Sequence, residues 1–124
     1  MILAWYAGKG CIDCGTLKGN FDCGHFRRRE CMPTRYHPWN LAKQNRRCNR
    51  YDGGRTFEFG AAIDRQYGRG TAAFLERLSR KIEPWTTEEL GTLRAAARWA
   101  CGHSSRRTSC SVRITVWCAK WRDL

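Results

Sequence analysis

The chain has 124 residues, with 23 lysines and arginines against 11 acidic residues and a formal net charge of +12. A chain of this length supports one domain, or one small domain with an appendage, and excludes two independent hydrophobic cores. So strong a positive field predicts a polyanionic partner. Arginine supplies most of the charge and its planar guanidinium pairs with phosphate oxygens, so nucleic acid is favoured over an acidic membrane or an acidic protein.

The start of the chain and its cysteines indicate where the protein works. No stretch approaches the roughly 20 consecutive apolar residues of a membrane-spanning helix, and the opening MILAWYAGKGC has too short an apolar run for a typical secretory signal. We therefore expect a cytoplasmic protein that does not enter a membrane. In that reducing compartment the eight cysteines favour metal binding over disulfides. The alternative interpretation of the cysteine count and the charge is a disulfide-rich, cationic extracellular protein.

Residues 1–55 have the composition of a loop-rich segment that needs a staple other than a large apolar core, because they hold five of the eight cysteines and two of the three prolines. Cys11 and Cys14, in CIDC, have the spacing with which a tight turn aims two thiolates at one zinc ion. Cys48 supplies a second half-site, with Asn45 where the matching cysteine would stand. The sequence therefore predicts a structural zinc site that is strong at three positions and broken at the fourth.

The fourth zinc ligand is open among several groups. Cys31, Cys23 or His37 could reach the ion from the intervening loop, or Asn45 or water could hold the position more weakly. For His37 an exposed loop position is the favoured interpretation. The alternative for the cysteines as a set is that they are reduced, buried thiols without a metal.

Basic side chains flank His25 and continue into the segment around the second half-site. The candidates for phosphate binding are Arg27, Arg28, Arg29, Arg35, Lys43, Arg46, Arg47 and Arg50. Because the two clusters bracket one segment, we favour phosphate contacts over a merely solvated charged face, and such contacts raise affinity without reading bases. Trp39, Phe26 and Tyr36 lie among them and could stack on unpaired bases, although core packing is their expected use.

Residues 56 to about 100 are expected to be helical. TFEFGAAIDRQYG repeats large apolar residues every four positions from Phe59 to Tyr67, and TAAFLERLSRKI places Leu75, Leu78 and Ile82 on one face. This segment predicts a helical extension of the N-terminal part.

The ends of these helices have their own signals. Thr56 and Thr71 are the expected N-caps, and Gly68 or Gly70 can end the first helix. Two acidic residues of the first helix, Glu58 and Asp64, are expected to face solvent, although either could approach a bound ion.

A third helix is expected after EPW, where Thr86 is followed three residues later by Glu89 in a capping-box pattern. Its apolar stripe consists of Leu90, Leu93, Ala97 and Ala100. Residues 101–124 form a poorly specified tail in which SVRITVW alternates weakly like a strand. His103 is expected to be incidental, and the tail cysteines, which lack close metal-type spacing, are Cys101, Cys110 and Cys118.

Between the two cysteine half-sites, DCGHFRRRECMPTRYHPWN carries His25 and then Asn40, and Asn49 follows the second half-site. This order resembles nucleases of the HNH (ββα-metal) type. The resemblance implies that His25 is a general base toward water, that Asn40 fixes its ring through a backbone contact, and that Asn49 helps to hold one divalent ion. Many HNH enzymes have a metal ligand directly before the base, where this chain has Gly24, and Asp22 is the nearest substitute.

The blocks DCGHF, MPTRYHPWN, QNRRCNR and EFGAAIDRQYGRGTAAFLERLSR, in this order and spacing, resemble the phage NinG (Rap) recombination protein family from residue 11 to about 98. The resemblance implies a structure-selective DNA endonuclease for branched intermediates such as Holliday junctions, with structural zinc and with magnesium or manganese for cleavage. Symmetric cleavage needs two active sites, so we expect a homodimer, and recombination proteins are further expected partners. The alternative is a non-catalytic, zinc-containing DNA- or RNA-binding accessory to recombination.

These expectations combine into one architecture. The fold class is α+β, with a small zinc-stapled treble-clef or ββα-metal (HNH-like) core over residues 1–55. A helical extension over residues 56–100 is expected to pack on this core, and residues 101–124 follow as the tail.

Overall fold

The structure is a computed structural model that describes residue 3, residues 6–82 and residues 84–102, with the backbone alone described at residues 96, 97 and 99–102. The described residues before position 83 form one compact unit, and those from Pro84 onward belong to another. The strand expected over residues 111–117, Cys110, Cys118 and His103 lie outside what is described, whereas Cys101 lies in the last turn of helix α5 (Thr87–Gly102). The division at residue 55 into an HNH-like core and a helical extension packed on it stays a prediction.

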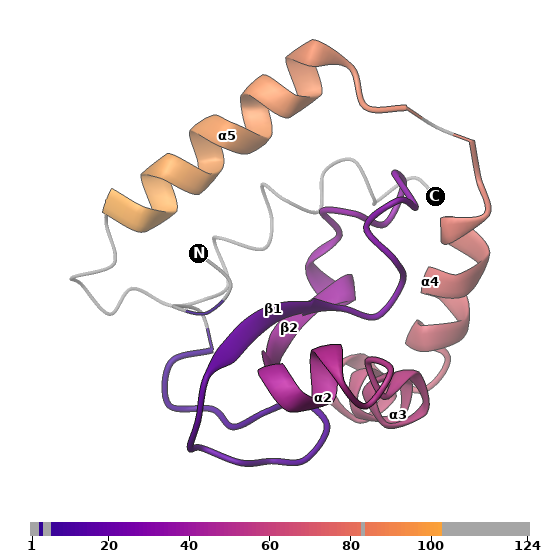
Figure 1. The fold of residues 1–124 in the computed structure, drawn as a ribbon. Coiled ribbons are helices and arrows are strands. Elements are labelled where there is room, and N and C mark those ends of the chain that lie inside the picture. The colour runs from indigo at the N-terminus through magenta and orange to yellow at the C-terminus, as the bar shows by residue number, and fades with distance from the viewer. Residues whose placement is uncertain (1–2, 4–5, 83, 103–124) are drawn as a thin grey trace. The chain divides into compact units, whose positions relative to one another are not determined.

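A two-stranded antiparallel sheet lies at the centre of the first unit. Strand β1 (Phe21–His25) pairs with β2 (Leu41–Asn45) so that Phe21 faces Asn45 and His25 faces Leu41. A short 3-10 turn, η1 (Pro38–Asn40), leads into β2, and helix α2 (Arg46–Arg50) starts directly after it. Figure 1 shows the two strands side by side with α2 leaving the end of β2. With the helices that follow, this arrangement confirms the expected mixed α+β class.

Gly24 of β1 lies directly against the side chain of Gln44 on β2. It is buried, and a Cβ built on it would lie 2.8 Å from the Cβ of Gln44 on the opposite strand. Gln44 is itself 1% exposed, so its side chain has nowhere else to go. Position 24 therefore has room only for glycine, which gives a structural reason why no metal-binding side chain stands directly before His25.

Helices α3 (Thr56–Tyr67) and α4 (Thr71–Ser79) supply half of the buried hydrophobic residues in the described part of the chain. Phe59 and Ile63 of α3 and Leu75 and Leu78 of α4 are each at most 2% exposed, and β2 contributes the buried Leu41. The four-residue apolar spacing thus marks the buried face of α3 at Phe59 and Ile63, and the three-residue spacing of Leu75 and Leu78 marks that of α4.

The expected N-caps of α3 and α4 are wrong by one residue. The residue before α3 is Arg55, in the left-handed conformation with φ 46°, and the residue before α4 is Gly70 with φ 93°. Thr71 instead donates its hydroxyl to the carbonyl of Gly68 at 2.7 Å. Arg55 and Gly70, each with a positive φ, form the turn before the helix and occupy the N-cap position. Each threonine is therefore the first residue of its helix.

Two further side chains differ from expectation. Asp64 does not face solvent freely, because its Oδ1 accepts a hydrogen bond from the N–H of Ala72 at 2.8 Å and so caps α4 from the neighbouring helix. Ile82 does not continue the buried stripe of α4. The helix ends at Ser79, and Ile82 is 98% exposed.

Helix α5 (Thr87–Gly102) belongs to the second unit and starts as predicted. Glu89 accepts from the Thr86 N–H at 2.8 Å, and the Thr86 hydroxyl accepts from the Glu89 N–H at 3.2 Å, which is the reciprocal pair of a capping box. Leu90 and Leu93 are half-buried.

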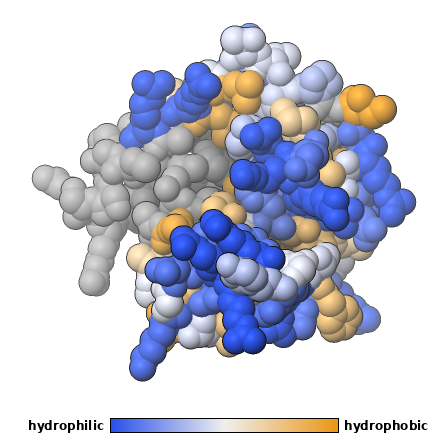
Figure 2. All heavy atoms as spheres, in the orientation of Figure 1, coloured by the Kyte–Doolittle hydropathy of each residue, from blue (hydrophilic) through white to orange (hydrophobic). Residues whose placement is uncertain are grey.

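Hydrophilic side chains cover most of the face seen in Figure 2, with hydrophobic ones scattered between them. In the part of the chain that is described, no helix combines the length and the apolar character needed to cross a membrane.

Candidate metal centre and phosphodiester site

The CIDC segment forms a tight turn that brings its two cysteines together. The Cys11 N–H donates to the carbonyl of Thr16, and the Gly15 N–H donates to the carbonyl of Cys11, both at 2.9 Å. Gly15 takes the positive φ of 72° that the turn requires. Ile12 then donates to the carbonyl of Lys43, which ties this turn to β2.

Three cysteines meet at the end of the hairpin. The sulfur atoms of Cys11, Cys14 and Cys48 all lie within 4.8 Å of one another, and Cys48 comes from α2. The backbone N–H of Asn45 donates to the Cys11 sulfur at 3.1 Å, a bond that stabilises a thiolate. Three sulfur donors at this spacing could hold a metal ion and are compatible with structural zinc.

The electrostatics of the cluster also favour a cation. Burial, together with the neighbouring thiols of Cys14 and Cys11, raises the pKa of Cys48 to about 12. Three thiolates this close repel one another, so they need a positive ion at their centre to be charged at neutral pH.

Both polar atoms of the Asn45 side chain already form hydrogen bonds away from the three sulfur atoms. Its Oδ1 accepts from the Arg47 N–H at 2.9 Å as the N-cap of α2, and its Nδ2 donates to the carbonyl of Lys18 at 3.4 Å. Cys23, Cys31 and His37 are not members of the cluster that the described residues form. The three-cysteine site therefore has no fourth protein ligand among these candidates as they stand.

The sequence interpretation missed the residues that surround the cluster. The carboxylate of Asp13 lies 3.9 Å from the Cys11 sulfur and accepts from Gln44 Nε2 at 2.6 Å, and Gln44 also donates to the carbonyl of Gly54 at 2.8 Å. Arg55 pairs with Glu58 at 2.7 Å and interacts with the Cys48 sulfur. The position of Asp13 between the two cysteines was the only signal for this in the sequence.

His25 ends β1 and is half-buried. Burial lowers its pKa below the ordinary 6.5, and the charges of Arg29 and Arg35 lower it further, while hydrogen bonds with the backbone of Cys23 and Arg35 act in the opposite direction. The imidazole is therefore neutral at pH 7, which is the state a general base requires.

Asn40 closes the long connection between the strands. Its side chain accepts from the Arg27 N–H at 2.7 Å and donates to the carbonyls of Arg27 and Thr34 at 3.1 and 3.0 Å, and Asn40 is fully buried. Its backbone carbonyl accepts from the Phe26 N–H at 3.0 Å. These bonds fix the backbone directly after His25, and with it the point from which the histidine ring extends.

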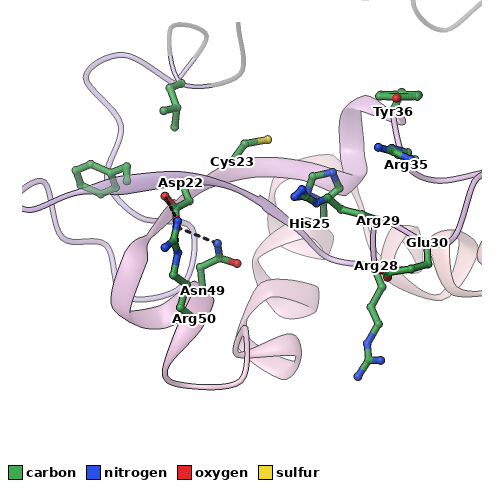
Figure 3. A pocket seen from close by; sticks show the side chains of 12 residues that line it. Asp22, Cys23, His25, Arg28, Arg29, Glu30, Arg35, Tyr36, Asn49 and Arg50 are labelled. Atoms are coloured by element: carbon green, nitrogen blue, oxygen red, sulfur yellow. Dashed lines mark hydrogen bonds and ion pairs between the residues drawn. The ribbon is translucent and has the colours of Figure 1, made fainter. Parts of the chain in front are cut away.

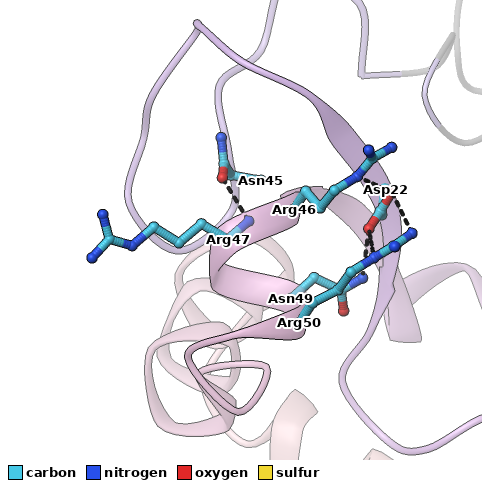
Figure 4. A network of polar contacts seen from close by, with 6 residues as sticks. All are labelled: Asp22, Asn45, Arg46, Arg47, Asn49 and Arg50. Atoms are coloured by element: carbon cyan, nitrogen blue, oxygen red, sulfur yellow. Dashed lines mark hydrogen bonds and ion pairs between the residues drawn. The ribbon is translucent and has the colours of Figure 1, made fainter.

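Asp22 joins β1 to α2. Its carboxylate accepts from Asn49 Nδ2 at 3.2 Å and from Arg50 Nε at 2.8 Å, and Arg46 Nε lies 3.5 Å from its other oxygen. Figure 4 shows the three α2 side chains converging on it. Burial alone would raise the pKa of Asp22, but these hydrogen bonds and charges together lower it, so the group is ionised at neutral pH.

A hollow of about 960 Å³ connects these groups, and Asp22, His25 and Asn49 all line it. In Figure 3, Asp22, Asn49 and Arg50 lie at one end of β1, whereas His25 lies toward the other end with Arg29 and Arg35 beyond it. Asp22 and His25 are three residues apart on a strand, about 10 Å. Side chains alternate along a strand, so these two leave β1 on opposite faces, and the hollow as a whole has the volume for a phosphate group.

The chain was compared with known families, with curated proteins and with solved structures. The family model described as Bacteriophage Lambda NinG protein matches residues 3–107. This chain belongs to the NinG family. No curated protein and no solved structure matches it. The match covers both the cysteine cluster and the His25 hollow, so both are features of a NinG chain.

The basic side chains of this NinG chain differ in what they contact. Those exposed are Arg28, Arg29, Arg46, Arg47 and Arg50, whereas Arg27, Arg35 and Lys43 are half-buried. Lys43 donates to the carbonyl of Lys9 at 2.9 Å and lies over the ring of Phe21.

The expected exposed loop position of His37 is wrong. His37 is 1% exposed, its Nδ1 accepts from the Trp39 N–H at 3.2 Å, and its ring packs against Trp39 and Phe74. Trp39 also stacks on Tyr67, and Phe26 packs against Phe59, so these aromatic residues serve the core as expected. Pro38 directs the chain into η1, and this turn carries His37 inward.

Proposed function

We propose that this NinG chain is a structure-selective DNA endonuclease of the HNH type that cleaves branched recombination intermediates, such as four-way junctions, by metal-assisted hydrolysis of a phosphodiester. The observation that carries the proposal is the common hollow of His25, Asp22 and Asn49, at a hairpin followed by a helix. The net charge of +12 and the arginines at its wall supply the attraction for DNA.

His25 acts as the general base in this proposal. The neutral imidazole takes a proton from a water molecule, whose oxygen attacks the phosphorus while the bond to the leaving sugar oxygen breaks. Asn40 is a positioning residue, since its hydrogen bonds to Arg27 set the direction of the strand end that carries His25.

Asp22 and Asn49 would hold the magnesium or manganese ion. A carboxylate and an amide oxygen are hard donors of the kind these ions accept, and magnesium sites often use only one or two carboxylates together with substrate phosphates. The bound ion would offset charge on the phosphate and on its leaving oxygen. To bind the ion, Asp22 must give up the hydrogen bond that it accepts from Arg50. The freed guanidinium of Arg50 would then lie beside the hollow and could bind a phosphate.

The cysteine cluster has a structural role in the proposal. Zinc at Cys11, Cys14 and Cys48 would hold the N-terminal turn against α2, and α2 carries Asn49 and Arg50 into the hollow. Symmetric cleavage of a four-way junction needs two such sites, so we propose that the protein acts as a homodimer in the host cytoplasm.

A non-catalytic DNA-binding accessory is the second candidate. The observation that favours it is that Asp22 is already ion-paired, with Arg46 of α2 at one carboxylate oxygen and Arg50 of α2 at the other. If Asp22 keeps these partners when DNA is bound, the hollow binds phosphate without the divalent ion.

The test is cleavage of a labelled four-way junction and of a linear duplex of matched sequence, in magnesium, in manganese and in EDTA. We expect metal-dependent cutting of the junction by wild type and a loss of at least a hundred-fold in His25→Ala. Cys23→Ala is the matched control, because Cys23 lines the same hollow but has no role in the chemistry. Tight junction binding with no cutting in either metal would refute the nuclease and leave the accessory.

The pH dependence gives a second check on His25. Its lowered folded pKa means that the base stays neutral until the pH falls below its ordinary value of 6.5. We therefore expect single-turnover cleavage to be independent of protonation at this group near pH 7 and to decline only below pH 6.5. An acid limb centred above pH 7 would assign the base to another group.

A further inference from the structure

Two aromatic side chains stand out in solvent on either side of one turn. Tyr51 is 80% exposed and Phe57 is 87% exposed, whereas Trp39 and Phe26 are packed against other rings. Single exposed apolar residues are ordinary on a protein surface. Here, however, both aromatic rings flank the same short segment of the basic hairpin-helix unit, and packing within the unit uses neither of them.

The turn that carries them is held firmly. The N–H groups of Tyr51 and Asp52 both donate to the carbonyl of Arg47, at 2.9 and 3.1 Å, and Gly54 donates to the carbonyl of Cys48 at 3.1 Å. From the other side, Gln44 donates to the carbonyl of Gly54. The aromatic rings therefore extend from a fixed backbone, so a flat partner can stack on them at a small cost in conformational entropy.

The backbone also adopts a conformation that needs an explanation. Arg55 has φ 46° and follows Gly53 and Gly54, which have φ 64° and 77°. Among the described residues Arg55 is the one non-glycine residue with a positive φ, a conformation that costs of order 1 kcal/mol or more in general. Its side chain interacts with Glu58 and Cys48, so this conformation links the turn to the metal centre.

Two exposed arginines near Tyr51 favour a polyanionic partner, while the acidic Glu58 beside Phe57 is paired with Arg55. Arg47 and Arg50 lie within four residues of Tyr51, both are exposed, and Arg50 lines the hollow. A second copy docked face to face at this turn would place the same exposed arginines opposite each other, so like charges disfavour it here. A nucleic acid offers both of the groups required, phosphates for the arginines and flat bases for the rings.

We propose that Tyr51 and Phe57 form a base-stacking surface that binds unpaired bases at the branch point of the DNA and so directs the protein to branched rather than continuous duplex. This inference rests on the proposed action on DNA, but it concerns binding and does not need cleavage. In a continuous duplex the bases are already stacked, so the rings gain nothing there, whereas at a branch each ring can cover one exposed base.

The experiment is fluorescence anisotropy in EDTA with a four-way junction that carries unpaired bases at its centre and with a blunt duplex of equal length. The double variant Tyr51→Ala with Phe57→Ala should bind the junction about ten-fold or more weakly, because stacking contributes roughly five- to hundred-fold per base. Its affinity for the duplex should stay within two-fold. Tyr51→Phe keeps the ring and should behave as wild type, and Ile82→Ala is the control for an exposed apolar side chain.

A direct readout of stacking accompanies the binding curves. With 2-aminopurine at the unpaired position, wild type should change the fluorescence of the base on binding, and the double variant should not. Equal loss on junction and duplex, or no loss on either, would overturn the inference. So would a fall in the sedimentation coefficient of the double variant with unchanged DNA affinity, since the rings would then bind a second copy.

The failure of this inference differs from the failure of the proposed function. If wild type never cuts DNA but the double variant has a lower affinity in EDTA for the junction alone, the proposed nuclease activity is refuted and the stacking surface is supported. If cleavage depends on His25 but the double variant binds and selects normally, the nuclease stands and the stacking surface is refuted.

Discussion

At the scale of single residues, Gly24 shows how packing can fix the identity of the residue before the candidate base His25. Gln44 fills the space in which a side chain at position 24 would lie, and its own hydrogen bonds hold the Asp13 carboxylate and the turn at Gly54. A metal ligand before His25 would therefore have to displace a buried glutamine that supports the cysteine cluster.

We predict that Gly24→Ala lowers the free energy of unfolding by about 1–3 kcal/mol, because the added methyl group overlaps the Gln44 side chain. Urea unfolding followed by tryptophan fluorescence measures the change. Gly91→Ala is the control, since its Cβ would have no neighbour within 4 Å in α5 and alanine favours a helix. Equal stability of Gly24→Ala and wild type would mean that Gln44 moves away at no cost.

A second residue-scale prediction concerns the buried His37, whose pKa burial lowers from 6.5 to about 4. Between these values the unfolded chain binds a proton at this position and the folded chain does not, so stability falls as the pH drops from about 6.5 toward 4. The full effect is about 3 kcal/mol.

The measurement is urea unfolding at pH 7 and pH 5 in excess zinc. His37→Asn retains an acceptor for the Trp39 N–H but does not titrate in this range, so it should lose about 2 kcal/mol less than wild type between the two pH values. Parallel losses in both proteins would show that His37 takes up a proton in the folded state.

At the scale of elements, residue spacing was sufficient to predict the helices and the meeting of the three cysteines. It was insufficient to predict where loop side chains lie. The helical spacing of the apolar residues in α3, and of Leu75 and Leu78 in α4, reflects direct burial. The three cysteines Cys11, Cys14 and Cys48 do meet. The burial of His37 and the capping of α4 by Asp64 depend on contacts between distant segments. No local pattern encodes such contacts, and the sequence therefore predicted both side chains wrongly.

The metal centre gives the element-scale prediction. Cys48→Ser should abolish zinc binding and melt the hairpin and α2, because metal affinity and folding are coupled there. Asn45→Cys should tighten zinc binding by adding a fourth thiolate, although the loss of the α2 N-cap costs about 1 kcal/mol. Competition with a chromophoric chelator measures both affinities.

Cys23→Ser is the control for these variants, since Cys23 is exposed on β1 and not part of the cluster. It should bind zinc as wild type does. An unchanged zinc affinity in Asn45→Cys would place the fourth ligand in another direction from the three sulfur atoms.

At the scale of the whole molecule, the charge of +12 predicts DNA binding that weakens steeply with salt. If about six phosphates are neutralised, affinity should fall by roughly a thousand-fold between 50 and 200 mM salt. Arg28→Gln with Arg29→Gln should reduce the slope by about two units, because both side chains line the hollow.

Arg80→Gln is the matched control for this prediction. Arg80 lies just beyond α4 and pairs with Glu76 at 3.0 Å, so its removal should change the salt slope by less than one unit. A double variant with the slope of wild type would show that DNA approaches the molecule over another basic surface.

The sequence positions of the three cysteines also bear on how the fold forms. Cys11 and Cys14 are close enough to chelate an ion on the unfolded chain, whereas Cys48 joins only after the segment that contains both strands has closed into a loop. A metal ion captured early by the CIDC pair would then act as a template that recruits α2. In that case the rate of refolding should rise with zinc concentration, and a newly made chain would acquire its shape and its metal in one event.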